Sequence, residues 1–392
     1  MFLRIIIILI ILSVTMEIFL HKRHTRNLGK ACRALYYAFT VVSLLPYILF
    51  QILGSRIDLG TIIAPGITSA AFLLFASNLI WKAPLALSLL ISKGQKHTAA
   101  TIFSLLATLL LLYGALWERH QLRTTHLTLH YDNLPAEADG IRIVQISDLH
   151  IGNHPSRYKL LERLQREIAE IDADLIIDCG DMVNIKSSEL DSVAMTILSR
   201  ITAPLGQYTV MGNHDRGDYI IDTVALPRQE HRTQLIELQS KMGWQNITDS
   251  TVIIPFGSEA IYLTAINYPA SLEVGAHGAG DREDYSHHFD ALPRDAFNIV
   301  VAHTPVMWPD ILEATPAELT LSGHVHAMQL RLPIGPRGWS PAALVYKHWS
   351  GLYAEGSSRL FVSDGVGSGI PIRIGVKPQI VVITLKKMGS EE

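Results

Sequence analysis

The chain contains 392 residues, of which 48% are hydrophobic and only 18% are charged. Soluble domains carry about 25% charged residues, so this composition excludes a chain that is exposed to water throughout. Residues 1–117 contain ten Lys or Arg and two Asp or Glu, whereas residues 118–392 contain 23 and 34. The acidic globular part argues against nucleic acid as a partner, because phosphate neutralisation needs a cationic surface. The two cysteines, Cys32 and Cys179, exclude a disulfide framework and a cysteine-rich zinc site.

Four apolar stretches in the first part are long enough to cross a lipid bilayer. They cover residues 5–20, 35–53, 61–81 and 99–117. Roughly 20 helical residues span a membrane, so residues 1–117 are predicted to form a four-span anchor. A cleaved signal peptide is the alternative for the first stretch, but no small-x-small cleavage site precedes the charged loop. We expect Glu17, near the end of this stretch, to reach the membrane interface.

The loops between these stretches differ in charge, and this difference predicts the orientation. The first loop carries five basic residues and no acid, and the third loop carries three basic residues and no acid. These residues are Lys22, Arg23, Arg26, Lys30 and Arg33 in the first loop, and Lys82, Lys93 and Lys96 in the third. Positively charged short loops stay in the cytoplasm. The pattern therefore predicts a multi-pass protein of the cell membrane whose globular part lies outside the cytoplasm.

From His126 onward, runs of strand length alternate with helical segments. Helical spacing of leucines predicts a helix over Arg157–Ile171, and a second helix is expected over residues 233–242. Apolar or β-branched runs predict strands at 141–147, 175–179, 208–211, 298–302 and 318–322, then at 251–255, 260–266, 360–363 and 380–385 without intervening helices. This order indicates an α/β domain of stacked sheets with helices on the outer faces.

Five of these runs are each followed by polar residues that can bind a metal ion. The groups are Asp148 and His150, Gly180-Asp181, Gly212-Asn213-His214-Asp215, His303, and Gly323-His324-Val325-His326. A single strand-end Asp is usually a turn residue, and a single His is usually structural. Five such groups at five strand ends instead predict one site at the edge of the sheets.

The donor types narrow the chemistry of this predicted site. Mixed carboxylate, imidazole and carboxamide donors without thiolate suit Mn, Fe, Zn or Co. The donors are too many for one ion, and two ions require a carboxylate that bridges them. Two divalent ions close together can clamp a phosphoryl group and stabilise both the attacking and the leaving oxygen.

The same five blocks, in this order, resemble the calcineurin-like metallophosphoesterase family. The resemblance covers about residues 140–385, and the Gly365–Arg373 tail with Pro378 is similar to the membrane-associated bacterial branch typified by YkuE and YaeI. That branch commonly has an acid after this proline and an aromatic residue after the Asn-His-Asp block. Gln379 and Arg216 occupy these positions here, and these two departures bear on the fine substrate specificity rather than on the metal ligands.

The resemblance implies a four-layer α/β/β/α sandwich over residues 140–392, preceded by a linker and a strand over 118–139. It also implies the role of each site residue. Asp148, His150 and His326 would hold the first metal, Asn213, His303 and His324 the second, and Asp181 would bridge them. His214 would face the leaving-group oxygen as general acid or charge stabiliser, and Asp215 would orient His214.

The predicted function is therefore hydrolysis of phosphoester or pyrophosphate bonds, with lipid-linked or cell-envelope phosphates as candidate substrates. The alternative is a membrane sensor or scaffold that binds without turnover. A transporter has little support, because the spans contain almost no ionisable residues besides Glu17.

Other polar residues have two interpretations. His154 and Asn184 either touch substrate or belong to polar loops, and Arg373 either binds a second phosphate or forms a structural ion pair. His277, His287 and His288 either line a lid or a regulatory metal site, or belong to a solvated loop.

Overall fold

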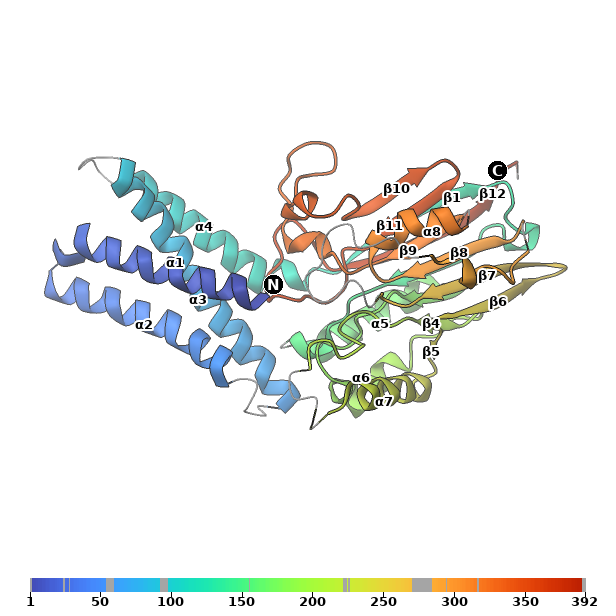
Figure 1. Cartoon of the computed structure of the whole chain (residues 1–392), viewed down its shortest axis with the longest axis horizontal. Helices are drawn as coiled ribbons and strands as arrows, with labels where there is room; N and C mark the ends of the chain where they lie inside the picture. Colours follow the sequence, from blue (N-terminus) through green and yellow to red (C-terminus); the bar gives the residue numbers. More distant parts are fainter. Residues whose placement is uncertain are drawn as a thin grey trace. The chain divides into compact units, whose positions relative to one another are not determined.

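The structure is a computed structural model of the chain. It describes residues 2–23, 25–27, 29–53, 60–91, 98–154, 156–220, 224, 226–269, 284–293, 295–315 and 317–389. The chain divides into two compact units, Met1–Glu118 and Arg119–Glu392. The first unit is helical, and the second contains the strands (Figure 1).

Four long helices form the first unit, and they cover the four apolar stretches of the sequence. They are α1 (Phe2–Arg23), α2 (Lys30–Leu53), α3 (Gly60–Ile91) and α4 (Thr98–Leu116). Within the described residues, two segments are long and apolar enough to cross a membrane, Ala70–Leu89 and Ile102–His120. The apolar segments of α3 and α4 agree with the predicted transmembrane region, and the spans expected for α1 and α2 stay predictions.

Lys82 corrects the sequence interpretation of the third loop. Helix α3 continues to Ile91, so Lys82 lies inside the helix and is fully buried. Its ammonium group forms an ion pair with Glu17 of α1 and donates a hydrogen bond to Thr40 Oγ1 of α2 at 2.9 Å. The placement of Lys82 in a loop was therefore wrong, and Glu17 is paired inside the bundle. Charged side chains within apolar helices are costly unless they pair, which explains why these two meet.

The second unit contains two six-stranded mixed sheets. In spatial order the first sheet is β1 (Arg123–Tyr131), β12 (Gln379–Lys387), β2 (Arg142–Ile146), β3 (Leu175–Asp178), β4 (Gln207–Thr209) and β5 (Gln245–Asn246). The second sheet is β10 (Gly351–Glu355), β11 (Ser358–Val362), β9 (Leu319–Ser322), β8 (Phe297–Ala302), β7 (Glu259–Ile266) and β6 (Ser250–Phe256). Strands β2 to β5 are parallel, as are β7, β8, β9 and β11. Their carboxyl ends therefore share one edge of each sheet.

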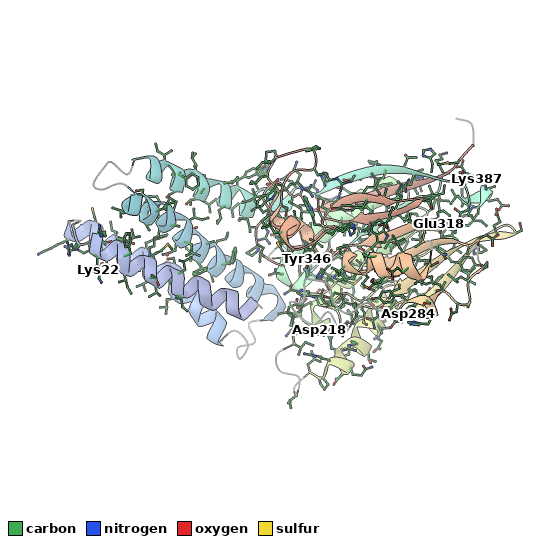
Figure 2. All side chains as sticks on the ribbon, turned by 45° about the horizontal axis from the view of Figure 1, so that its top comes forward. Lys22, Asp218, Asp284, Glu318, Tyr346 and Lys387 are labelled. Atoms are coloured by element: carbon green, nitrogen blue, oxygen red, sulfur yellow. The ribbon has the colours of Figure 1, made fainter. Side chains whose placement is uncertain are left out.

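Alternate side chains of the central strands belong to different cores, as the period of two in a strand requires. Ile143 and Ile177 pack with Ile299 of the other sheet, whereas Val144 and Ile176 pack with the helices outside the first sheet. The side chains that fill the space between the sheets are drawn in Figure 2.

Helices cover the outer face of each sheet. Helices α5 (Arg157–Ile171), α6 (Ser192–Leu198) and α7 (Arg228–Lys241) cover the first sheet, and α8 (Trp308–Ala314) packs on the second. The four-layer α/β/β/α sandwich is therefore confirmed.

The element boundaries follow the sequence prediction where periodicity is strong. Helix α5 has the predicted ends, whereas α7 begins at Arg228, before the predicted start at residue 233. The first turns of α7 are polar and carry no apolar stripe, so periodicity could not reveal them. Helices α6 and α8 were not predicted, and each has only seven residues, which is too short for a periodic signal.

Candidate metal centre

The predicted donors lie together where the carboxyl ends of strands from both sheets meet. Asp148 and His150 follow β2, Asp181 follows β3, and Asn213 follows β4. From the second sheet, His303 follows β8, and His324 and His326 follow β9. Parallel strands end at the same edge of a sheet, so segments that are distant in sequence place their polar side chains close together.

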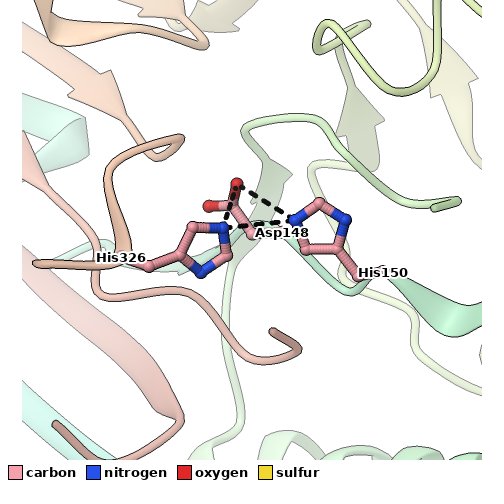
Figure 3. A group of neighbouring side chains, drawn as sticks. All are labelled: Asp148, His150 and His326. Atoms are coloured by element: carbon pink, nitrogen blue, oxygen red, sulfur yellow. Dashed lines mark hydrogen bonds and ion pairs between the residues drawn. The ribbon is translucent and has the colours of Figure 1, made fainter. Parts of the chain in front are cut away.

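Asp148, His150 and His326 form the first group of donors, and their polar atoms point toward one another (Figure 3). The Nε2 atoms of His150 and His326 are 3.2 Å apart, and Asp148 Oδ1 is 3.2 Å from His326 Nε2. At most one of two facing imidazole nitrogens can carry a proton between them. This arrangement suits a shared cation.

The second group contains Asp181, His303 and His324, joined by Asn213. His303 Nε2 lies 3.2 Å from Asn213 Oδ1, 3.3 Å from His324 Nδ1 and 3.2 Å from Asp181 Oδ2. The same Asp181 Oδ2 atom is 3.8 Å from His150 Nε2 of the first group. The Asp181 carboxylate is thus shared by the two groups, as a bridging ligand would be.

Five of these donors have left-handed backbone conformations, which are costly for residues other than glycine. The φ angles are 56° at Asp148, 41° at His150, 59° at Asp181, 70° at His324 and 50° at His326. Each such residue costs about 1–3 kcal/mol, and such residues cluster at functional sites. The fold therefore holds this edge of the sheets in a strained arrangement that aims the side chains inward.

Two glycines allow the donor segments to approach one another closely. A Cβ atom at Gly212 would lie 2.1 Å from Asp181 Oδ1, and one at Gly323 would lie 2.3 Å from Asp148 Oδ2. No side chain fits at either position, so these glycines are required by close packing at the donors.

The charges of the donors suit a cation. Burial raises the pKa of Asp148, but His326 and His303 outweigh burial, and the net pKa is below its usual range. Burial also raises the pKa of Asp181, and again nearby imidazoles, His303 first, hold the net pKa well below its usual value. Burial lowers the pKa of His324 to about 3, with His303 adding to the effect. Ionised carboxylates and neutral imidazoles are the forms that bind metal.

His303 behaves differently because it lies between the carboxylates. Burial lowers its pKa, but Asp181 and Asp148 raise the net value to about 10. A proton on His303 therefore takes the place beside Asp181 that a cation would fill. Its other nitrogen, Nδ1, is 2.7 Å from the Cys179 carbonyl, which fixes the ring and leaves Nε2 toward the other donors.

His214 lies beside the donors, and its orientation differs from the sequence interpretation. Its Nδ1 is 2.5 Å from the Asn184 carbonyl oxygen, and its ring stacks on Tyr219 with 4.0 Å between centroids. The Asp215 carboxylate instead accepts hydrogen bonds from the backbone N–H groups of Gly212, Met182 and Val183 at 3.0–3.2 Å. In this structure Asn184 contacts His214, whereas Asp215 ties the loop after β4 to the loop after β3.

Arg373 and His154 are both buried and make contacts within the fold. The buried Arg373 guanidinium donates to the carbonyls of Asp364, Gly365 and Gly367, and its Nη2 lies 3.4 Å from His326 Nδ1. These contacts give Arg373 a structural role through carbonyl hydrogen bonds rather than through the expected ion pair. The His154 ring is buried against His120, with 5.0 Å between centroids, and burial lowers its pKa to about 2.

The structure also shows the contacts of Gln379 and Arg216, the two residues that depart from the family pattern. Gln379 accepts a hydrogen bond from the Asp364 N–H and donates to Thr125 Oγ1. Arg216 donates to the Tyr268 carbonyl and lies 3.9 Å from the Asp218 carboxylate, which Figure 2 labels. Arg216, His287 and His288 line a cavity of about 270 Å³, whereas His277 lies outside the described residues.

Three tyrosines border the donors and were missed in the sequence. The Tyr219 hydroxyl accepts from Asn213 Nδ2 at 3.0 Å, and the Tyr346 hydroxyl is 3.4 Å from His324 Nε2. The Tyr268 ring lies 5.6 Å from the His324 ring. Tyr268 follows β7, so the strand-end argument could have found it. Tyr346 lies in an irregular segment that carries no sequence signal.

Comparison with known proteins identifies the family. Residues 141–328 match the family described as calcineurin-like phosphoesterase. The metallophosphoesterase YkuE of Bacillus subtilis strain 168 is 31% identical over 282 residues, covering 70% of this chain and 89% of YkuE. The chain belongs to the calcineurin-like phosphoesterase family. The family and the branch expected from the sequence are confirmed, and with them a metal-dependent hydrolase of phosphoric esters.

Two further relatives extend this result. A transmembrane protein with a metallophosphoesterase domain from Danio rerio is 27% identical, covering 73% of this chain and 63% of the relative. The UDP-2,3-diacylglucosamine pyrophosphatase LpxG of Chlamydia trachomatis is 26% identical, covering 72% of this chain and 96% of LpxG. The transmembrane relative and the apolar segments of α3 and α4 together support association with a membrane.

Proposed function

We propose that this phosphoesterase hydrolyses phosphoester or pyrophosphate bonds with two divalent metal ions, drawn from Mn, Fe, Zn or Co. The observation that carries the proposal is the Asp181 carboxylate, which lies 3.2 Å from His303 of one donor group and 3.8 Å from His150 of the other. A carboxylate shared by two donor groups is what a dinuclear site requires.

The proposed ligands follow the two groups. Asp148, His150 and His326 would hold one ion, Asn213, His303 and His324 would hold the other, and Asp181 would bridge them. The donor set fits, because carboxylates and imidazoles converge on one place in two groups. Two divalent ions bound there supply charge that stabilises the phosphoryl oxygens and lower the pKa of the attacking water.

The chain itself supplies the proton for the leaving group in this proposal. The Nδ1–H of His214 faces the Asn184 carbonyl, so in the doubly protonated imidazolium the second proton is on Nε2, from which it can pass to the leaving oxygen. Tyr219 packs against the His214 ring and restricts its rotation. Asp215 accepts hydrogen bonds from both the loop after β3 and the loop after β4, and it thereby fixes the backbone position of His214.

We also propose an anchor of four spans over residues 1–117, a linker and strand over 118–139, and a phosphoesterase domain over 140–392 outside the cytoplasm. The basic first loop supports this orientation. An anchored domain favours lipid-linked or envelope phosphates as substrates, and the similarity to a pyrophosphatase is consistent with this class. A silent sensor or scaffold is not favoured, because each proposed ligand position carries a metal-binding side chain.

The test is turnover of bis(p-nitrophenyl) phosphate by the purified full-length protein with Mn²⁺. Asp181→Asn is expected to lower turnover of bis(p-nitrophenyl) phosphate by about 100-fold or more, because it removes the shared ligand. His214→Ala is expected to lower turnover of diphenyl phosphate, whose leaving group needs a proton, by about 100-fold or more, because it removes the proton donor. Metal analysis is expected to give two equivalents in the wild type and fewer in Asp181→Asn. His130→Ala, at an exposed histidine of β1, is the matched control. Unchanged turnover in both site variants would overturn the assignment.

A reporter fused to the C-terminus tests the orientation. A reporter that is active only outside the cytoplasm is expected to be active, and one that is active only inside is expected to be silent. The reverse result would place the phosphoesterase domain in the cytoplasm and exclude envelope substrates.

A further inference from the structure

Glu189 has a buried carboxylate that binds the loops after β2 and β3 together. Its Oε2 accepts hydrogen bonds from the Gly152 N–H at 3.1 Å and from the Asn184 N–H at 2.5 Å. Its Oε1 accepts from the Ile185 N–H at 2.9 Å and from the Lys186 N–H at 3.3 Å. Glu189 is 4% exposed, so these four bonds replace the water that an ionised carboxylate would otherwise bind.

The sequence leaves room for this carboxylate at Gly152. A Cβ atom at Gly152 would lie 2.1 Å from the carboxyl carbon of Glu189. Gly152 is two residues after His150, and Asn184 is three residues after Asp181. The carboxylate therefore lies where two donor segments leave the site, although it touches no donor in the first group or the second.

Asn184 connects Glu189 to His214. The N–H of Asn184 is held by Glu189, and the carbonyl of Asn184 is 2.5 Å from His214 Nδ1. A carbonyl oxygen accepts only, so it keeps a proton on Nδ1 and directs Nε2 to the opposite side of the ring. A shift of the Asn184 peptide would change both the tautomer and the direction of His214.

We propose that Glu189 is a positioning residue for phosphoester hydrolysis and acts through the Asn184 carbonyl on His214. The proposal rests on the proposed function, in which His214 protonates the leaving group. In that step the water oxygen forms a bond to phosphorus, and the bond from phosphorus to the leaving oxygen breaks. The leaving oxygen keeps the electron pair and takes the Nε2 proton of the His214 imidazolium, which becomes a neutral ring protonated on Nδ1, and the proton that the attacking water loses passes to solvent.

The test compares two substrates whose leaving groups differ in their need for a proton. Bis(p-nitrophenyl) phosphate releases p-nitrophenolate, which is stable without a proton, whereas diphenyl phosphate releases a much more basic phenolate. Glu189→Gln places an amide N–H₂ against backbone N–H groups and should displace the Asn184 peptide. We expect kcat for diphenyl phosphate to fall about 10-fold or more, with kcat for bis(p-nitrophenyl) phosphate within about 3-fold of wild type.

Three controls separate positioning from a general loss of structure. His214→Ala should show the same difference between substrates with a larger amplitude, and Glu189→Gln should add nothing to His214→Ala in the double variant. Glu162→Gln, at an exposed residue of α5, should change neither substrate. Metal content and melting temperature of each full-length variant complete the comparison.

Each outcome decides between interpretations. If Glu189→Gln loses bound metal, Glu189→Asp, which keeps the charge but shortens its reach, should show the same substrate difference. An equal loss on both substrates, or loss of metal in both Glu189 variants, makes Glu189 a structural brace and overturns the inference. If His214→Ala itself shows no difference between substrates, the role of His214 in the proposed function fails, and the inference fails with it.

Discussion

Each unit of the molecule contains a buried polar cluster, and the two clusters are built in opposite ways. In the helical unit, the Lys82 ammonium donates to Glu17 and Thr40, and the Tyr36 hydroxyl donates to Glu17 at 3.3 Å. Donors there meet acceptors. At the metal centre, imidazole nitrogens instead face each other and carboxylates at 3.2–3.3 Å.

The backbone conformation also differs between the two clusters. The polar residues of the helical unit lie on regular helices, whereas five of the metal-centre donors have positive φ angles. A matched cluster lowers the cost of burying polar groups and specifies how helices pack. A cluster of facing imidazoles and carboxylates on strained backbone is instead the arrangement that binds a cation. Burial of polar groups alone therefore does not distinguish a structural network from a functional site. The distinction lies in whether hydrogen-bond donors meet acceptors within the cluster.

Of the predicted effects, removal of metal should show the largest difference between the two clusters. Chelation is expected to abolish turnover and to lower the free energy of unfolding of the second unit by about 3–4 kcal/mol, since the lost ligand binds only the folded state. Calorimetry of the full-length protein before and after chelation, with Mn²⁺ added back, checks both effects. A melting temperature and turnover that chelation leaves unchanged would contradict a metal-dependent centre.

Breaking the ion pair in the helical unit should give the next largest effect. Lys82→Met leaves the partly buried Glu17 without its cation and is expected to cost about 3 kcal/mol of stability. Glu17→Gln combined with Lys82→Met removes both charges and should recover most of this loss. Turnover of soluble substrate should follow the wild type in the double variant. A double variant that is less stable than Lys82→Met alone would contradict the view that the ion pair only compensates two charges inside the helical unit.

Asp178 offers a smaller test within the second unit. Its Oδ2 accepts from Thr209 Oγ1 at 2.8 Å, and burial, followed by the charge of Asp215, raises its pKa well above the usual value. A carboxyl with a raised pKa in the folded state stabilises the fold below about pH 4, and this stability is lost as pH rises toward the folded pKa. The loss is at most about 1.4 kcal/mol for each pH unit.

Asp178→Asn removes this titration while keeping the shape of the side chain. Its melting temperature should fall less than that of the wild type between pH 5 and pH 7, and its turnover should be retained. Parallel pH profiles for the two proteins would show that Asp178 is ionised in the fold.

Much of the site was predictable because its residues directly follow strands. Asp148, Asp181 and His303 each come after a continuous apolar run, and parallel strands bring such positions to one edge. Glu189 and Tyr346 follow no such run and were missed. Lys82 was misplaced because the apolar stretch was ended at residue 81, whereas α3 continues to Ile91.

The sequence by itself determined the α/β architecture, the family and the set of polar groups that converge, because strand periodicity and short motifs are local properties. Only the tertiary structure decided which groups touch. It assigned Asn184 rather than Asp215 to His214, and Lys82 to Glu17. Those contacts join residues 30 and 65 positions apart, and their partners are set by how helices and loops pack, which local sequence patterns do not encode.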